Sequence, residues 1–195
     1  PIIIKIIKDF SKYGIKNIYL SLNYKADIIK SFIKKIPLKP NISFILENKY
    51  LGTAGSLYKI KKYNYNNFIL ANCDILINLN ISKFTNFHKK EKNDLTILVA
   101  KQIVNLPYGI CLTNDDNTLI KIDEKPTYEY KINAGMYIIN KSVLDYVKPN
   151  TYLDMDKLIE KLISNKLKIK IYEFDYNNWK EIGRMKDYIP FLYEN

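Results

Sequence analysis

The chain has 195 residues, of which 47% are hydrophobic and 26% charged, so it is long enough for one domain with its own core. Apolar residues recur throughout the chain, which argues against disorder. Two cysteines are too few for a disulfide framework, and no apolar run approaches the ~20 residues of a membrane-spanning helix. The formal net charge is +11, yet Arg184 is the only arginine, and lysine is a solvated point charge rather than a bidentate reader of phosphate or guanine.

The first apolar run is interrupted by Lys5 and Lys8 and lacks a small-residue cleavage site, so it does not match a signal peptide. A cytoplasmic protein that binds neither nucleic acid nor a membrane is therefore expected. The sequence leaves open whether it forms a homo-oligomer.

The first half of the chain alternates between two hydrophobic patterns. Apolar residues at helical spacing are followed by short apolar runs typical of buried strands, and this alternation favours a parallel α/β sheet with helices on both faces. The predicted order is helix 2–13, strand 17–22, helix 27–35, strand 42–46, helix 55–62, strand 67–71, helix 81–90 and strand 95–100.

The second half begins with short strands separated by turn residues, which indicate an antiparallel or mixed addition to the sheet. No composition shift marks a domain boundary, so residues 1–195 are expected to form a single domain. The predicted order is strand 108–112, strand 119–123, strand 134–139, helix 142–147, helix 155–164, strand 167–172 and helix 186–192.

Candidate functional residues follow the predicted strands, because ligands of open α/β sheets bind at the carboxyl ends of the strands. Asp74 comes just after strand 67–71. Residues 51–55 (LGTAG) form a loop with two glycines before a helix, where the backbone can approach a ligand closely and helical N–H groups are free. Neither feature is specific by itself. Asp74 also suits a turn cap, and the glycines suit an ordinary turn.

Five segments, in the same order, resemble motifs of the sugar-phosphate nucleotidyltransferase family, which makes nucleoside-diphosphate sugars. The matched family motifs are LGTAG, NGD, EKP, NAGIY and WLDIGRPEDY. The segments that resemble them are LGTAG at 51–55, NCD at 72–74, EKP at 124–126, NAGMY at 133–137 and WKEIGRMKDY at 179–188. The resemblance covers essentially the whole chain and is closest to bacterial sugar-1-phosphate guanylyltransferases that supply surface glycans.

The resemblance implies a Rossmann-like three-layer α/β/α fold with a mixed, mainly parallel sheet. It also implies transfer of a nucleotidyl group from an NTP to a sugar 1-phosphate, with Mg²⁺ as cofactor and pyrophosphate as the second product. Mg²⁺ and lysine would offset the gathered phosphate charge, so no nucleophilic side chain is required. The implied roles are Asp74 and Lys125 for catalysis, Asp74 and Glu181 for the metal, Leu51, Gly52, Thr53 and Asn72 for the nucleotide, and Glu124, Lys125, Asn133 and Gly135 for the sugar phosphate.

Structural roles are the alternatives for some of these residues. Lys125 is one of thirty lysines and suits an ordinary solvated side chain, whereas Glu181 suits a surface ion pair with Lys180 or Arg184. The single histidine, His88, is expected to be solvated on a lysine-rich helix face. Asp74 and Glu181 are nevertheless expected to lie together at one sheet edge, with the 51–55 loop and Lys125 opening onto the same cleft.

Two departures from the family pattern affect the functional hypothesis. Its glycine-rich GGxGTRL loop would lie upstream of Pro1, so the chain is expected to lack the first strand and that loop and to be poorly active alone. Cys73 replaces a glycine, and Glu181 replaces an aspartate. A non-catalytic nucleotide-binding or regulatory homologue is therefore the alternative function, and a nucleic-acid-binding protein is the weaker third. The sequence does not identify the base or the sugar.

Overall fold

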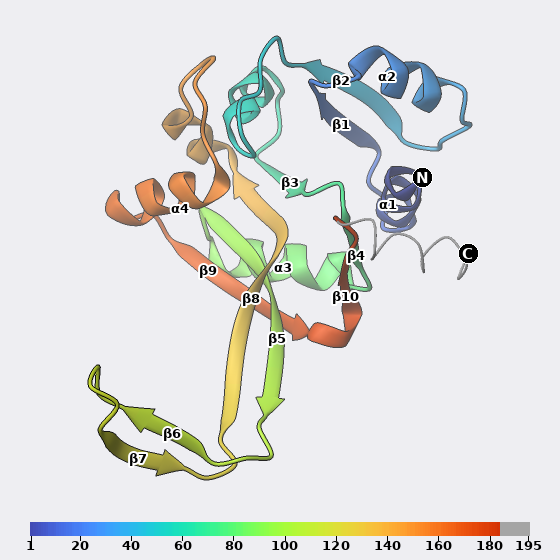
Figure 1. Cartoon of the computed structure of the whole chain (residues 1–195). Coiled ribbons are helices and arrows are strands. Elements are labelled where there is room, and N and C mark those ends of the chain that lie inside the picture. The colour runs from blue at the N-terminus through green and yellow to red at the C-terminus, as the bar shows by residue number, and fades with distance from the viewer. Residues whose placement is uncertain (184–195) are drawn as a thin grey trace.

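The central sheet has four strands in the order β3-β8-β5-β9. The structure is a computed structural model that describes residues 1–183 (Figure 1), so the helix predicted at 186–192 lies outside the described residues. Strand β8 is antiparallel to both β3 and β5, and β9 is parallel to β5. Three strands therefore run in one direction and β8 in the other, which confirms the expected α/β class with a mixed sheet. The strands are β3 (Asn67–Ala71), β5 (Leu95–Asn105), β8 (Thr127–Asn140) and β9 (Ile169–Asp175).

Two hydrophobic clusters cover the two faces of this sheet. Consecutive residues of β8 alternate between them, since Tyr137 and Ile139 face one cluster while Met136 and Ile138 face the other, as a pleated strand requires. The first cluster contains buried residues of α4 (Met155–Ser164), and the second contains those of α3 (Ile81–Glu91). One helix on each face gives the three-layer arrangement seen in Figure 1.

The N-terminal part of the chain forms a smaller parallel pair. Strands β1 (Asn17–Leu22) and β2 (Asn41–Leu46) pair in register and are connected by α2 (Ala26–Lys34). The preceding helix α1 (Ile2–Lys12) buries Ile7. Within the described residues this pair is a sheet of its own, so β1 and β3 each keep one edge without a strand partner.

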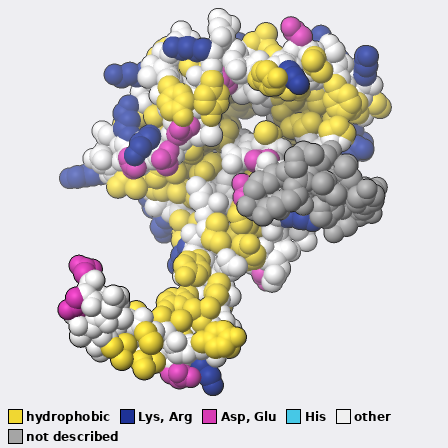
Figure 2. All heavy atoms as spheres, in the orientation of Figure 1, with side chains coloured by type: hydrophobic (Ala, Val, Ile, Leu, Met, Phe, Trp, Pro, Cys, Tyr) yellow, Lys and Arg dark blue, Asp and Glu magenta, His cyan; other side chains and the backbone are white. Residues whose placement is uncertain are grey.

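Strands β5 and β8 continue past the end of β3 and carry a protruding hairpin, which we call the β6–β7 ribbon. Its strands are β6 (Ile110–Thr113) and β7 (Leu119–Asp123), and they form a separate two-stranded sheet. The ribbon extends away from the body in Figure 1, and Figure 2 shows hydrophobic side chains uncovered on it. Ile120, for example, is 63% exposed.

Several predicted elements differ from the structure. Residues 55–62 and 141–146 form 3₁₀ turns rather than α-helices, which is typical of short helical segments whose ends are tied down by tertiary contacts. The strands at 108–112 and 119–123 were expected to extend the main sheet and instead form the ribbon. The remaining elements of the structure are η1 (Gly55–Lys62), β4 (Ile75–Ile77), η2 (Lys141–Tyr146), η3 (Tyr176–Asn178) and β10 (Trp179–Glu181). The sequence did not predict β4, η3 or β10. No helix among residues 1–183 has both the length and the apolar character needed to cross a bilayer.

His88 is buried rather than solvated, so the sequence-based expectation for this residue is wrong. Only 2% of its surface is exposed, because α3 turns this residue toward the sheet. Its Nδ1 lies 2.8 Å from Thr96 Oγ1 and its Nε2 lies 3.1 Å from Asn67 Oδ1. Burial lowers the pKa of His88, and the nearby Asp94 opposes this effect only in part.

This burial predicts that the protein loses stability as the pH falls below about 6.5. The unfolded chain keeps an ordinary histidine pKa and takes up a proton there, whereas folded His88 resists protonation, so acid favours unfolding. The slope is at most about 1.4 kcal/mol per pH unit. Urea unfolding between pH 5 and 7.5 measures it, and because the chain has one histidine the slope in this window reports His88. A flat profile would contradict the prediction.

Candidate active site

The loop after β3 places Asp74 beside Glu181. Strand β4 starts one residue after Asp74 and pairs antiparallel with β10, where Ile75 is opposite Glu181. The backbone oxygen of Asp74 also accepts a 2.7 Å hydrogen bond from the N–H of Ile182. This short ladder joins two segments more than 100 residues apart and brings Asp74 and Glu181 near one another in the fold.

The distance between the two carboxylates suits a shared cation. Asp74 Oδ2 lies 3.2 Å and Glu181 Oε1 lies 3.7 Å from the position that a Cβ on Gly183 would occupy. The two oxygens are therefore at most about 7 Å apart, a gap that partly hydrated Mg²⁺ can bridge. Asp74 Oδ1 is buried and has no hydrogen-bond partner among the described residues. A carboxylate that has one unpartnered oxygen, and whose other oxygen lies near a second carboxylate, fits a hard divalent cation.

The described residues contain no group of three or more histidine, cysteine or carboxylate side chains arranged to hold a metal. Two carboxylates alone are nevertheless an ordinary protein contribution to a Mg²⁺ site, because this ion keeps several waters and binds substrate phosphates. The donor set is therefore consistent with a metal held jointly by protein and substrate.

Asn72, Asn133 and Gly135 meet next to Asp74. A Cβ on Gly135 would lie 2.8 Å from Asn72 Nδ2, and Gly135 has a φ of +72°, so the close approach and the backbone conformation both require glycine. The Gly135 N–H donates to Asn133 Oδ1 at 3.1 Å, and Asn133 Nδ2 donates to the Tyr137 hydroxyl at 2.9 Å. Burial is the main cause that raises the pKa of Tyr137, which keeps this hydroxyl neutral. Three of the predicted site residues thus form one polar cluster at the end of β3.

The loop 51–55 is held against the segment that leads into α4. Leu51 is buried, with 2% of its surface exposed, and the polar groups of Thr53 are bonded to Asp154 and Met155. Gly52 has a φ of +77°, and a Cβ there would lie 2.6 Å from the Leu153 carbonyl oxygen. The glycine is therefore required by protein packing.

Glu124 and Lys125 lie far from the Asp74 cluster. Thr127 pairs with Asn105 at the outer end of the long ladder, whereas Asn133 pairs with Val99 near its base. Asn133 comes six positions after Thr127 on the extended strand, so the two residues lie about 20 Å apart. The structure thus places Lys125 at the base of the β6–β7 ribbon, and the expectation that it shares a cleft with Asp74 is wrong for this conformation. The reason is that β8 continues as a partner of β5 beyond the end of β3.

Sequence reasoning missed one carboxylate at the end of β2. The Glu47 side chain accepts a 2.5 Å hydrogen bond from Ser21 Oγ and a longer one, at 3.3 Å, from the Leu51 N–H. Two parallel strands, β1 and β2, therefore end beside the 51–55 loop with a fixed, half-buried carboxylate between them. Its position directly after a strand, four residues before the LGTAG segment, was the available signal.

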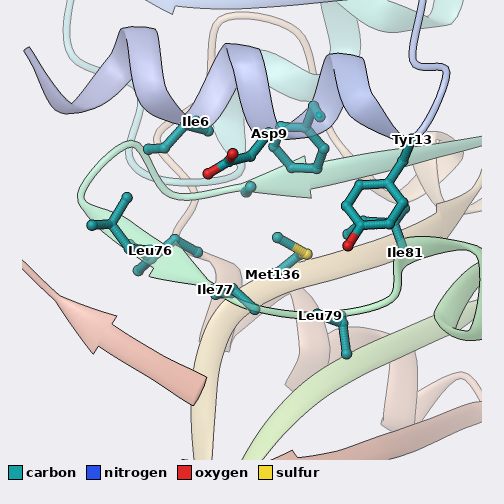
Figure 3. Close-up of a pocket in the computed structure, with 11 residues that line it drawn as sticks. Ile6, Asp9, Tyr13, Leu76, Ile77, Leu79, Ile81 and Met136 are labelled. Atoms are coloured by element: carbon teal, nitrogen blue, oxygen red, sulfur yellow. The ribbon is translucent and has the colours of Figure 1, made fainter. Parts of the chain in front are cut away.

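The hollow beneath α1 is a poor substrate site, although it borders β4 (Figure 3). Its volume of about 30 Å³ holds one or two waters rather than a nucleotide. Its lining is largely apolar, with Ile6 and Phe10 from α1 and Ile77 from β4, and Asp9 is the only carboxylate among the described residues that line it.

An α/β/α fold with carboxylates and glycine loops at the ends of its strands is the architecture of nucleotide-binding enzymes. The family model described as nucleotidyl transferase matches residues 1–194. This chain therefore belongs to the nucleotidyl transferase family, as its motifs predict.

Curated relatives include mannose-1-phosphate guanyltransferases of Schizosaccharomyces pombe, at 29% identity, and of Debaryomyces hansenii, at 30%. Each match covers 97% of this chain and 54% of the relative, so the chain spans about half the length of the curated relatives it matches. Among solved structures, HddC from Yersinia pseudotuberculosis complexed with GMP-PN has a TM-score of 0.75 at 27% identity and covers all of this chain and 85% of that one.

A glucose-1-phosphate thymidylyltransferase from Bacillus anthracis, described as putative in its name, superposes with a TM-score of 0.69 at 16% identity. That match covers 97% of this chain and 80% of the other. At this identity the likeness concerns the fold alone.

Proposed function

We propose that this chain forms much of an enzyme that transfers a guanylyl group from GTP to a sugar 1-phosphate, giving a GDP-sugar and pyrophosphate for surface glycan precursors. Family membership supports the reaction class. The guanyltransferase names of the curated relatives and the guanine nucleotide in the HddC complex support GTP as the donor.

The single observation that carries the proposal is the pair formed by Asp74 and Glu181. These two carboxylates would hold Mg²⁺, which when bound neutralises phosphate charge. Asn133 and Gly135 would orient the sugar beside these carboxylates, and Asn72 packs against Gly135. An oxygen of the sugar phosphate then attacks the α-phosphorus of GTP, and the bond from this phosphorus to the bridging oxygen breaks as pyrophosphate leaves.

Further residues are needed for a complete site. The unpartnered edges of β1 and β3 support the expectation of an additional strand, and with it a glycine-rich loop that binds the triphosphate. Glu124 and Lys125 stay proposed sugar-phosphate ligands. Their participation requires the β6–β7 ribbon to fold back toward Asp74.

Pyrophosphate release by the full-length natural protein tests the proposal. GTP, CTP, UTP, ATP and dTTP are each combined with a panel of sugar 1-phosphates, with and without Mg²⁺. Turnover with GTP and a sugar 1-phosphate at about 1–10³ s⁻¹ supports the proposal. The 195-residue chain alone is expected to be slower by at least ~10²-fold, because it would lack preorganised donors to the triphosphate.

Glu47 is expected to select guanine. Its carboxylate can accept two hydrogen bonds from the N1–H and amino group of guanine, and adenine does not present this donor pair. Glu47→Gln is expected to lower the preference for GTP over ATP, measured as a ratio of kcat/KM values, by about 10-fold or more. Glu129→Gln, which alters an exposed carboxylate on β8, serves as the control. An unchanged ratio would show that Glu47 only shapes the turn.

The non-catalytic homologue is the second candidate function, and two observations favour it. Glu181 stands where the family motif has aspartate, and Lys125 lies about 20 Å along β8 from the Asp74 cluster. Nucleotide binding by the full-length protein without pyrophosphate release for any substrate pair would establish this function in place of the enzymatic one.

A further inference from the structure

A two-segment hydrogen-bonded clasp shapes the loop 51–55. The Leu153 N–H donates to the Leu51 carbonyl and the Ala54 N–H donates to the Leu153 carbonyl, each at 2.9 Å. Two further bonds involve side chains: the Thr53 N–H donates to Asp154 Oδ1 at 3.0 Å, and the Met155 N–H donates to Thr53 Oγ1 at 2.8 Å. The clasp therefore joins segments about 100 residues apart.

Thr53 caps α4 in place of its own N-cap residue, Asp154. Asp154 is the N-cap residue of α4 but makes no side-chain bond to its own helix. Thr53 Oγ1 instead binds a free N–H in the first turn of α4, while the Asp154 carboxylate binds the N–H of Thr53 just before η1. Each segment thus satisfies a backbone donor of the other.

The clasp carries a fixed negative charge at neutral pH. The Tyr152 hydroxyl donates to Asp154 Oδ2 at 2.5 Å. This bond and those from Thr53 lower the pKa of Asp154, while the same bond raises the pKa of Tyr152 to about 12. Charge-assisted hydrogen bonds are roughly twice as strong as neutral ones, so the carboxylate stabilises the clasp more than a neutral acceptor would.

The clasp also connects the loop with the sugar side of the proposed site. Ala54, Met155 and Tyr137 belong to one buried cluster, and the Tyr137 hydroxyl accepts a hydrogen bond from Asn133. The charge of Asp156, one residue into α4 from the clasp, contributes to the raised pKa of Tyr137. A displaced clasp would therefore disturb the nucleotide loop first and the Asn133 cluster less directly.

The geometry points to Thr53 and Asp154 as positioning residues for the nucleotide, which act by holding the 51–55 loop in its binding shape. The N–H and the hydroxyl of Thr53 are both bonded within the protein, so these two groups hold the loop rather than point to a ligand. This inference rests on the proposed function and revises the nucleotide-contact role that the family resemblance implies for Thr53.

Variants of the full-length protein separate this role from direct contact. Thr53→Val removes the acceptor of the Met155 N–H, and Asp154→Ala removes the acceptor of the Thr53 N–H, while the two backbone bonds to Leu153 remain in both. Thr53→Ser and Asp154→Asn keep an oxygen acceptor and serve as conservative rescues. Asp145→Asn changes an exposed carboxylate that pairs with Lys61 outside the clasp and is the matched control. The measurements are calorimetric GTP binding, KM and kcat, and hydrogen exchange of the Thr53 and Ala54 amides.

Thr53→Val and Asp154→Ala are each expected to raise the Kd and KM for GTP about 10-fold, since each leaves a backbone N–H of the clasp without its acceptor. The KM for the sugar 1-phosphate should change less than about threefold, amide exchange should quicken, and the rescues should restore most of the loss. The double variant should cost less than the sum of the two single ones, because both loosen the same clasp.

Three results would overturn the inference: additive effects in the double variant, GTP affinity unchanged by Asp154→Ala, or a loss in Thr53→Val without faster amide exchange. Failure of the proposed function would look different. The unaltered protein would then bind no GTP, or bind it without releasing pyrophosphate, while amide exchange would still report on the clasp itself. Circular dichroism of every variant shows whether it is folded.

Discussion

Asp74→Asn in the full-length protein is expected to lower kcat/KM for pyrophosphate release by about 10²–10³-fold without loss of thermal stability. The Asp74 carboxylate is half-buried beside Glu181, and its Oδ1 has no partner in the described structure. Two neighbouring carboxylates repel one another unless a cation lies between them. The amide removes one charge, so the metal-free variant should unfold at an equal or higher temperature than the unaltered protein.

The response to Mg²⁺ distinguishes a metal ligand from a turn residue. Mg²⁺ should raise the unfolding temperature of the unaltered protein, because a ligand that binds only the folded state stabilises it. Asp74→Asn should lose this increase, whereas Asp115→Asn, at an exposed position between β6 and β7, should keep it. If Asp74→Asn kept full activity and the full Mg²⁺ response, the two-carboxylate site would be wrong.

Local sequence patterns predicted most helices and strands of the first half of the chain and the site residues that follow strand β3. The helix and strand alternation of the first half depends on hydrophobic period, and the structure has helices or strands at nearly all of those positions. Asp74 and Asn72 were identifiable because ligands of α/β sheets bind where strands end. The family motifs added Glu181, which β10 brings to Asp74.

Features set by distant segments could not be predicted in this way. His88 lies on a lysine-rich stretch, and only the packing of α3 against the sheet shows that it faces inward. The position of Lys125 depends on how far the β5–β8 ladder continues, and strand pairing is a long-range property. The clasp likewise joins two segments about 100 residues apart, so the sequence around Thr53 alone could not reveal that Asp154 binds it.

Gly52 and Gly14 both have a φ of +77°, so substituting each with alanine measures how tightly the clasp packs around Gly52. Gly52→Ala is expected to lower the free energy of unfolding by about 2–5 kcal/mol, and Gly14→Ala by about 1–2 kcal/mol. The left-handed backbone penalises a Cβ equally at both positions. The surroundings differ, because a Cβ at Gly52 would lie 2.6 Å from the Leu153 carbonyl oxygen, whereas no atom of residues 1–183 lies within 4 Å of a Cβ at Gly14.

Urea unfolding of both variants isolates this contact, since the backbone penalty cancels in their difference. The close approach to Leu153 and Asp154 should leave a difference of about 1–3 kcal/mol. Gly52→Ala should also weaken GTP binding by the full-length protein, because the 51–55 loop must move away from α4 to admit the methyl group. Equal losses of stability in the two variants would show that the loop and the α4 segment separate easily. The clasp would then be too weak to hold the nucleotide loop in one shape.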